Sequence, residues 1–186
     1  TFQWRERLIS NKNKFTWNHP IHEWLLCNDP GVLSNNIENG DNCHKVVFVH
    51  NRKDKAIDPN RNLRIIEKYL EKNGESEVRF LYYAGLEYGN VGNHAQMINY
   101  LTKYIERSGW SHEQYQACLK LGRHYLACQM YDNCLEMAFK AISLEEKWGE
   151  AYFLICQVYY LKSISNSGDI QHRNALKAVH FGELML

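Results

Sequence analysis

Hydrophobic residues along the last two-thirds of the chain recur with the three- and four-residue spacing of amphipathic helices. The first such segment predicts a helix over 59–72, with Asp58 as its N-cap and Pro59 in its first turn. Gly74 closes this helix as a C-terminal glycine. Its apolar positions fall on one helical face: Leu63, Ile65, Ile66, Tyr69 and Leu70.

Three later segments align with one another: FLYYAGLEYGNVGN (80–93), CLKLGRHYLACQ (118–129) and AYFLICQVYYLKS (151–163). The small residues Gly85, Gly122 and Cys156 occupy the same place in each, spaced by 37 and then 34 residues. An aromatic residue follows three positions later in each segment: Tyr88, Tyr125 and Tyr159. A 34-residue period of this kind resembles the tetratricopeptide (TPR) repeat, in which the small residue lets two helices approach and the aromatic fills the gap.

The second helix of each predicted repeat is also visible: HAQMINYLTKYIE (94–106), YDNCLEMAFKAISLEE (131–146) and RNALKAVHFGEL (173–184). Ser111 and Gln114 have the spacing of a capping box at the start of the second repeat. The polar stretch SISNSGDIQH (163–172) is interpreted as an insertion between the helices of the third repeat. We therefore expect at least three stacked helical hairpins from about residue 76 onward.

The segments before residue 58 are shorter and mixed in character. The stretches FQWRERLI (2–9) and KVVFVHN (45–51) predict strands, and KFTWNHPIHEWLL (14–26) predicts an extended piece because the residue before Pro20 avoids the helical region. The Asn-, Asp- and Gly-rich residues 27–43 predict a loop. No proline follows residue 59, so we divide the chain into a mixed part, 1–57, and a helical repeat part, 58–186.

The composition narrows the classes of function. The formal net charge is +1, which argues against nucleic acid as the main partner. No stretch has the length of apolar sequence that a membrane span needs, and the first residues lack a signal peptide. Because the chain begins with Thr1 rather than Met, we expect it to be part of something longer. The six cysteines lack a C-x-x-C pair, so we expect reduced thiols and a cytoplasmic location.

One stretch, FTWNHPIHEWL (15–25), carries candidate chemistry, because it holds His22 and Glu23 among aromatic residues. A zinc-protease motif of the H-E-x-x-H type is rejected, since Leu26 stands where the second histidine is needed. The sequence also lacks a G-x-S-x-G nucleophile turn and a glycine-rich phosphate loop.

The order of motifs resembles a family 2 glycosyltransferase of the GT-A type with C-terminal TPR repeats. The resemblance is carried by WRERLI, FTWNHPIHEWL, KVVFVHN and the helix DPNRNLRIIEKYLEKN, followed by RFLYYAGLEYG. It implies that 1–57 is the α/β or β-containing end of a catalytic domain. It also implies a nucleotide-sugar donor and a glycan or protein acceptor.

The same resemblance implies roles for individual residues. His22 would bind a divalent metal, Mn or Mg, and Glu23 would be the catalytic base. Arg7 would contact the diphosphate, and Trp17 would offer a ring face to the sugar. The Asp-x-Asp that holds the metal in that family is absent from this chain, so we do not expect the chain alone to transfer sugar. From the residues alone, hydrogen bonding of His22 and Glu23 inside a packed aromatic cluster is the favoured interpretation, and the resemblance makes the catalytic interpretation equal to it.

The alternative function is a non-catalytic TPR module that binds a peptide or protein partner in a groove along its inner helices. The residues expected to line that groove are Arg79, Tyr82, Leu86, Gln116, Arg123, Glu150, Phe153 and Gln157. Tyr82 and Leu86 stand where a clamp for chaperone tails needs Lys and Asn, so that subtype is disfavoured.

Overall fold

The computed structural model describes residues 15–21, 24–27 and 58–185. The chain divides into two compact units, Thr1–Tyr69 and Leu70–Leu186. The described residues form two short strands and seven helices, so the fold is mainly α, as the sequence predicts. The division at residue 57 into a catalytic remnant and a repeat domain stays a prediction, as do the strands expected at 2–9 and 45–51, which lie outside the described residues.

The described part of the first unit contains a β-hairpin. Strand β1 (Phe15–Asn18) pairs antiparallel with β2 (Trp24–Cys27), and Asn18 lies opposite Trp24. The expectation of one continuous extended piece is therefore wrong. His19, directly before Pro20, has a φ of 68°, in the left-handed region that turns the chain back on itself.

Helix α1 (Arg61–Asn73) begins two residues later than the sequence predicts. Asp58 instead closes a turn before the helix, because its Oδ1 accepts a hydrogen bond from the Asn60 N–H at 3.0 Å. The predicted end is confirmed. Gly74 has a φ of +65°, which glycine adopts without steric cost, and its N–H donates to the Leu70 carbonyl at 2.7 Å.

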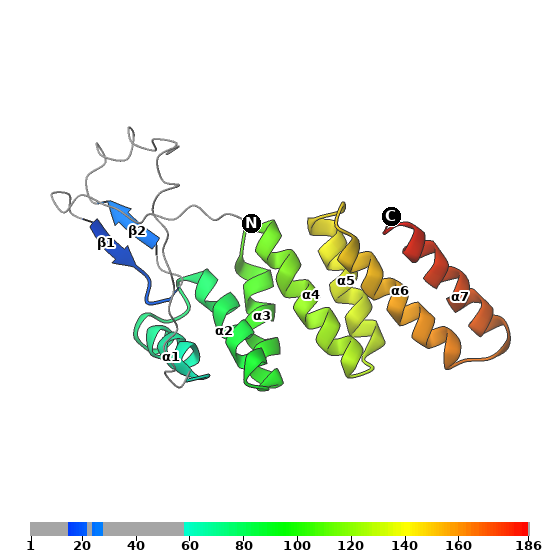
Figure 1. Cartoon of the computed structure of the whole chain (residues 1–186), viewed down its shortest axis with the longest axis horizontal. Helices are drawn as coiled ribbons and strands as arrows, with labels where there is room; N and C mark the ends of the chain where they lie inside the picture. The colour runs from blue at the N-terminus through cyan, green and yellow to red at the C-terminus, as the bar shows by residue number, and fades with distance from the viewer. Residues whose placement is uncertain (1–14, 22–23, 28–57, 186) are drawn as a thin grey trace, which may run out of the picture. The chain divides into compact units, whose positions relative to one another are not determined.

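The second unit contains three helical hairpins, which confirms the predicted repeats (Figure 1). In Figure 1 they follow one another from green to red as α2 with α3, α4 with α5, and α6 with α7. Their bounds are α2 (Val78–Asn90), α3 (His94–Arg107), α4 (Ser111–Ala127), α5 (Tyr131–Leu144), α6 (Gly149–Ile164) and α7 (Gly168–Glu183). The two helices of a hairpin contact each other, and consecutive hairpins contact through α3 with α4 and α5 with α6. Helix α4 also contacts α6 directly.

The insertion predicted at 163–172 is not a loop. Helix α6 extends to Ile164 and α7 begins at Gly168, which leaves only 165–167 as the connection. The Ser165 N–H donates to the Leu161 carbonyl, so the polar residues that look like a loop in the sequence first cap α6. The remaining ones form an exposed first turn of α7.

The small residues lie where the helices of a hairpin meet, as predicted. A Cβ on Gly85 would lie 2.6 Å from the Leu101 side chain, so no larger residue fits there without a shift. A Cβ on Gly122 would lie 3.7 Å from Met137 Cβ in α5, the other helix of its hairpin, and 3.0 Å from Leu154 Cδ1 in α6 of the next hairpin. The Cys156 Sγ is 3.6 Å from the place of a Cβ on Gly182 in α7.

The predicted aromatic positions fill the space next to these contacts. Tyr88 stacks on Tyr100 across the first hairpin, with ring centroids 5.4 Å apart. Tyr159 stacks on Phe181 across the third hairpin, at 5.9 Å. The tyrosines therefore take the packing role that the repeat pattern assigns to them.

Candidate functional site

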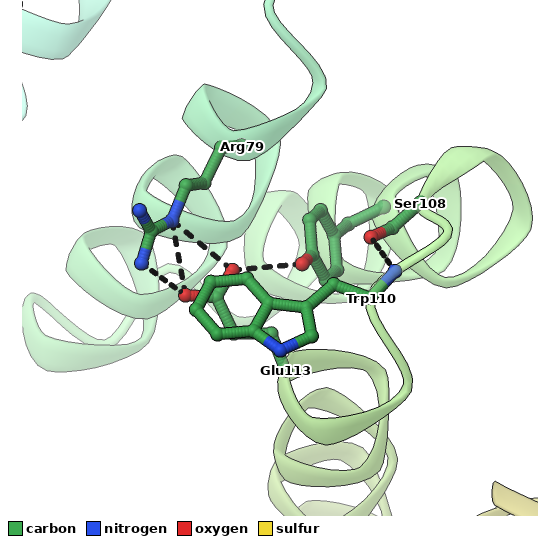
Figure 2. Close-up of polar contacts among 5 residues, drawn as sticks. Arg79, Ser108, Trp110 and Glu113 are labelled. Carbon is green, nitrogen blue, oxygen red and sulfur yellow. Dashed lines mark hydrogen bonds and ion pairs between the residues drawn. The ribbon is translucent and has the colours of Figure 1, made fainter. Parts of the chain in front are cut away.

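A buried polar cluster joins the first two hairpins (Figure 2). Glu113, in the first turn of α4, is 8% exposed. Arg79 of α2 donates to Glu113 Oε1 through Nη2 at 2.6 Å and through Nε at 3.0 Å. The Tyr104 hydroxyl of α3 donates to Glu113 Oε2 at 2.8 Å. Both carboxylate oxygens are therefore occupied by donors from the preceding hairpin.

The electrostatics of the cluster match this arrangement. Burial opposes the charge of Arg79, but the hydrogen bonds and charge of Glu113 outweigh it and raise the Arg79 pKa above its ordinary value. Burial is the largest cause that raises the pKa of the Tyr104 hydroxyl, and the hydrogen bond to Glu113 raises this pKa further, so the hydroxyl stays neutral. The Trp110 ring covers the Arg79 guanidinium, whose carbon lies 4.7 Å from the ring centroid (Figure 2).

This cluster is a structural junction and not a catalytic centre. A catalytic acid or base needs a proton position open to substrate, whereas the Glu113 oxygens are held by Arg79 and Tyr104. The sequence prediction placed Arg79 on the face that lines the groove, and the structure adds that its guanidinium is paired with Glu113. The signal that sequence reasoning missed is the spacing of Arg79 and Glu113, opposite charges 34 residues apart, which is one repeat length.

The contact between the second and third hairpins has its own hydrogen bonds, made by other types of residue than Arg79 and Glu113. The Tyr115 hydroxyl donates to Glu150 Oε2 at 3.1 Å, across the contact of α4 with α6. The Trp148 ring meets the Tyr115 ring edge-on, with centroids 4.8 Å apart. Ser111 donates to Glu145 Oε1 at 3.0 Å instead of capping its own helix, so the predicted capping box is wrong. Gln114 reaches back to the Ile105 and Ser108 carbonyls.

One exposed face of α6 is mainly apolar. Its members follow the spacing of one helical face, and we call Phe153, Gln157, Tyr160 and Ile164 the α6 stripe. Phe153 is 47% exposed, Tyr160 57% and Ile164 60%. Large apolar side chains aligned on one exposed face mark an interaction surface more often than scattered ones do.

Helix α4 carries the cationic residues Lys120 and Arg123, and the Lys120 side chain reaches toward α2, where its Cε lies 3.5 Å from the place of a Cβ on Gly89. Arg123 is exposed and Lys120 is half-buried, and neither forms an ion pair with a residue in the described part of the chain. Arg123 acts electrostatically on the Tyr115 hydroxyl, which donates to Glu150 at the start of α6. Of the other predicted groove residues, Tyr82, Leu86 and Gln116 are half-buried.

Three of the four residues assigned to sugar transfer lie outside the part of the chain that the structure describes. Arg7, His22 and Glu23 lie outside the described residues, and Trp17 lies in β1, opposite Leu25 of β2. Within the described ranges, no group of three or more His, Cys, Asp or Glu side chains is arranged to hold a metal ion. The catalytic, metal and diphosphate roles therefore stay predictions.

Two further properties concern the described residues. Cys118, Cys128, Cys134 and Cys156 are free thiols, as the sequence predicts. Burial raises the pKa of the Cys118 and Cys134 thiols to about 11, which keeps them protonated and unreactive. Among the helices that the structure describes, none is both long and apolar enough to cross a membrane.

The comparisons with known proteins show the fold. No protein-family profile matches the chain, and no curated protein matches it. The solved structure titled "MamA MSR-1 C2", of a TPR-repeat protein, is 17% identical, with a TM-score of 0.51 over 67% of this chain and 68% of that chain. A second solved structure, titled "Crystal structure of MamA", is 18% identical and covers 69% of this chain and 96% of that chain. Its TM-score is 0.30, so we infer nothing from it about the fold. The similarity supports the TPR-like solenoid and gives no support to a GT-A part.

Proposed function

We propose that this chain is a TPR-type interaction module that binds a polypeptide partner on the face formed by α2, α4 and α6. The observation that carries the proposal is the α6 stripe, with Phe153, Tyr160 and Ile164 about half exposed on one helical face. Leaving such side chains in water is unfavourable by roughly 25 cal/mol for each Å² of apolar surface, and a bound partner removes that cost.

The polar chemistry of the described residues supports binding over catalysis. The most buried carboxylate, Glu113, is held by Arg79 and Tyr104, and so serves the junction between hairpins. The α6 stripe offers exposed apolar area, which is a binding feature.

Sugar transfer in a longer parent protein is the second candidate function. It rests on the order of motifs from WRERLI to RFLYYAGLEYG, and it assigns Glu23 as base and His22 as metal ligand. An Asp-x-Asp after a βα pattern upstream of Thr1 in the parent gene would support it. In that case the repeats would bind the acceptor or a protein partner.

The proposal is tested with a displayed library of random peptides selected on the full 186-residue chain. Selected peptides are then measured against the Tyr160→Lys variant, which puts a charge in the middle of the α6 stripe. The matched control is Val91→Lys, because Val91 is an exposed apolar residue in the loop between α2 and α3. We expect peptides that bind Tyr160→Lys about tenfold more weakly and the control as tightly as the unchanged chain.

Two results contradict the proposal. One is a selection that yields no peptide above background. The other is a set of peptides that bind the Tyr160→Lys variant as well as they bind the unchanged chain. Circular dichroism of both variants confirms that the comparison is made between folded proteins.

A further inference from the structure

We infer that the joint between the first and second hairpins is a hinge that opens in mild acid, at the end where His94 and His124 meet. We call these two residues the histidine pair. The inference concerns the second unit alone and does not rest on the proposed function. It follows from where the pair lies, from how the opposite end of the same joint is held and from the charges around the two rings.

The histidine pair lies at one end of the contact between α3 and α4. His94 is the first residue of α3, and His124 lies in the last turn of α4. Their rings stack across the joint, with centroids 4.6 Å apart and an angle of 28° between the ring planes. His94 is exposed and His124 is half-buried. Because α3 and α4 belong to different hairpins, this ring contact is made while the two hairpins lie against each other.

The opposite end of the joint is held by the buried polar cluster around Glu113. Tyr104, in the last turn of α3, donates to Glu113 in the first turn of α4, and Arg79 of α2 donates to the same carboxylate. The Gln114 side chain adds a hydrogen bond to the Ile105 carbonyl. None of these groups is a histidine, the side chain that ordinarily takes up a proton between about pH 5 and 8. Mild acid therefore acts on the other end of the joint.

The histidine pair takes up protons less readily when the joint is closed. Burial lowers the pKa of His124 below its ordinary 6.5, and the neighbouring charge of His94 lowers this pKa further. In an opened joint His124 meets water and His94 moves away from it, so both causes weaken. The open form then binds protons more readily than the closed form, and its share rises as the pH falls through about 6.5.

The other titratable groups near the pair do not neutralise it. The Cys128 Sγ, which lies 3.7 Å from His124 Nε2, belongs to a free thiol. Lys120, one turn before His124 on α4, is itself a cation. Glu136 of α5 acts on the Tyr125 hydroxyl, whereas the charge that acts on His124 is that of His94. No ion pair in the described part of the chain includes either ring, so two protonated rings would repel each other without a carboxylate to offset them.

The test is nuclear magnetic resonance of the full chain, in which nuclear Overhauser effects (NOEs) report protons that lie close together. One NOE joins the two rings of the histidine pair. A second joins Lys120 to Gly89 of α2 at the same end of the joint, where Lys120 Cε lies 3.5 Å from the place of a Cβ on Gly89. A third joins Gln114 to Ile105 at the opposite end. Spectra are recorded at about pH 7.5 and about pH 5.5, on either side of the ordinary histidine pKa.

We expect all three NOEs at the higher pH. At the lower pH the ring NOE and the Gly89–Lys120 NOE should weaken at least about twofold, while the Ile105–Gln114 NOE persists. His94→Gln should keep the Gly89–Lys120 NOE at both pH values, because it leaves a single ionisable ring at the joint. The matched control is His112→Gln on the same helix, which should behave like the unchanged chain because His112 contacts Trp148 at the next joint.

Three results overturn the inference. The first is a Gly89–Lys120 NOE that persists in acid, because the His94 ring then at most turns into water and the joint stays closed. The second is an equal loss of that NOE in His94→Gln, which would place the cause outside the histidine pair. The third is the loss of all three NOEs together, which would mean that the two hairpins separate or unfold as a whole and do not pivot on the Glu113 end.

Discussion

Glu113 joins the first two hairpins through hydrogen bonds from Arg79 of α2 and Tyr104 of α3. Replacing it with Gln keeps the shape and removes the charge that Arg79 and Tyr104 bind. Breaking a fully buried ion pair costs about 3–5 kcal/mol, but the Arg79 side chain is 46% exposed and can turn to water. We therefore expect Glu113→Gln to lower the free energy of unfolding by about 1–3 kcal/mol, measured by urea denaturation.

Glu106→Gln is the control for that measurement, because Glu106 is an exposed glutamate of α3. It should change the unfolding free energy by less than about 0.5 kcal/mol. Equal effects of the two changes would show that the cluster seen in Figure 2 contributes nothing to the junction.

At the residue scale, the sequence predicts packing better than polar contacts. Gly85, Gly122 and Cys156 are recognisable because close helix contacts demand small side chains at fixed intervals. Glu113 carries no such signature, since a charged residue in the first turn of a helix is ordinarily solvated there. Its burial follows from where Arg79 of the previous repeat comes to lie, which only the stacked fold determines.

At the scale of elements, the contact of α3 with α4 carries a pair of histidines. The rings of His94 and His124 stack with centroids 4.6 Å apart, and the Cys128 Sγ lies 3.7 Å from His124 Nε2. Burial, and then the neighbouring charge of His94, lower the His124 pKa below its ordinary 6.5. The unfolded chain therefore takes up this proton more readily than the folded one, so His124 destabilises the fold as pH falls through about 6.5.

His94→Gln removes the neighbouring charge and leaves the burial of His124. The variant should lose less stability than the unchanged chain when the pH is lowered from about 8 to about 5. Urea midpoints at both pH values measure the difference, with His172→Gln, an exposed histidine of α7, as control. A loss on acidification that is the same in all three proteins would exclude the stacked pair as its source.

The boundaries of elements show where pattern reasoning ends. The end of α1 at Gly74 is predictable because a left-handed residue after a helix is usually glycine. The loop expected at 163–172 is wrong because Ser, Asn and Gly favour turns by composition, while helix α7 forms through its contacts with α6. The same contacts extend the two helices into a stretch that looks like a loop in the sequence.

At the scale of the whole molecule, the second unit is built from contacts between neighbouring hairpins. Helix α7 contacts α6 through pairs such as Gly182 with Cys156 and Phe181 with Tyr159. Helix α6 is held on its other side by the contact of Leu154 with Gly122. In such an array, the stability of a helix depends on the interfaces at its own two sides and not on the whole chain.

Deleting residues 168–186 should therefore loosen the third hairpin and leave the first two folded. Removal of α7 uncovers Cys156 and Tyr159, so the amides of α6 should exchange at least about tenfold faster with deuterium. The amides of α3 and α4 should keep their protection, because their own interfaces are intact. Hydrogen exchange read by mass spectrometry measures both in one experiment. A uniform loss of protection from α2 to α6 would mean that the hairpins unfold as one unit, in which case nearest-neighbour stacking does not describe this solenoid.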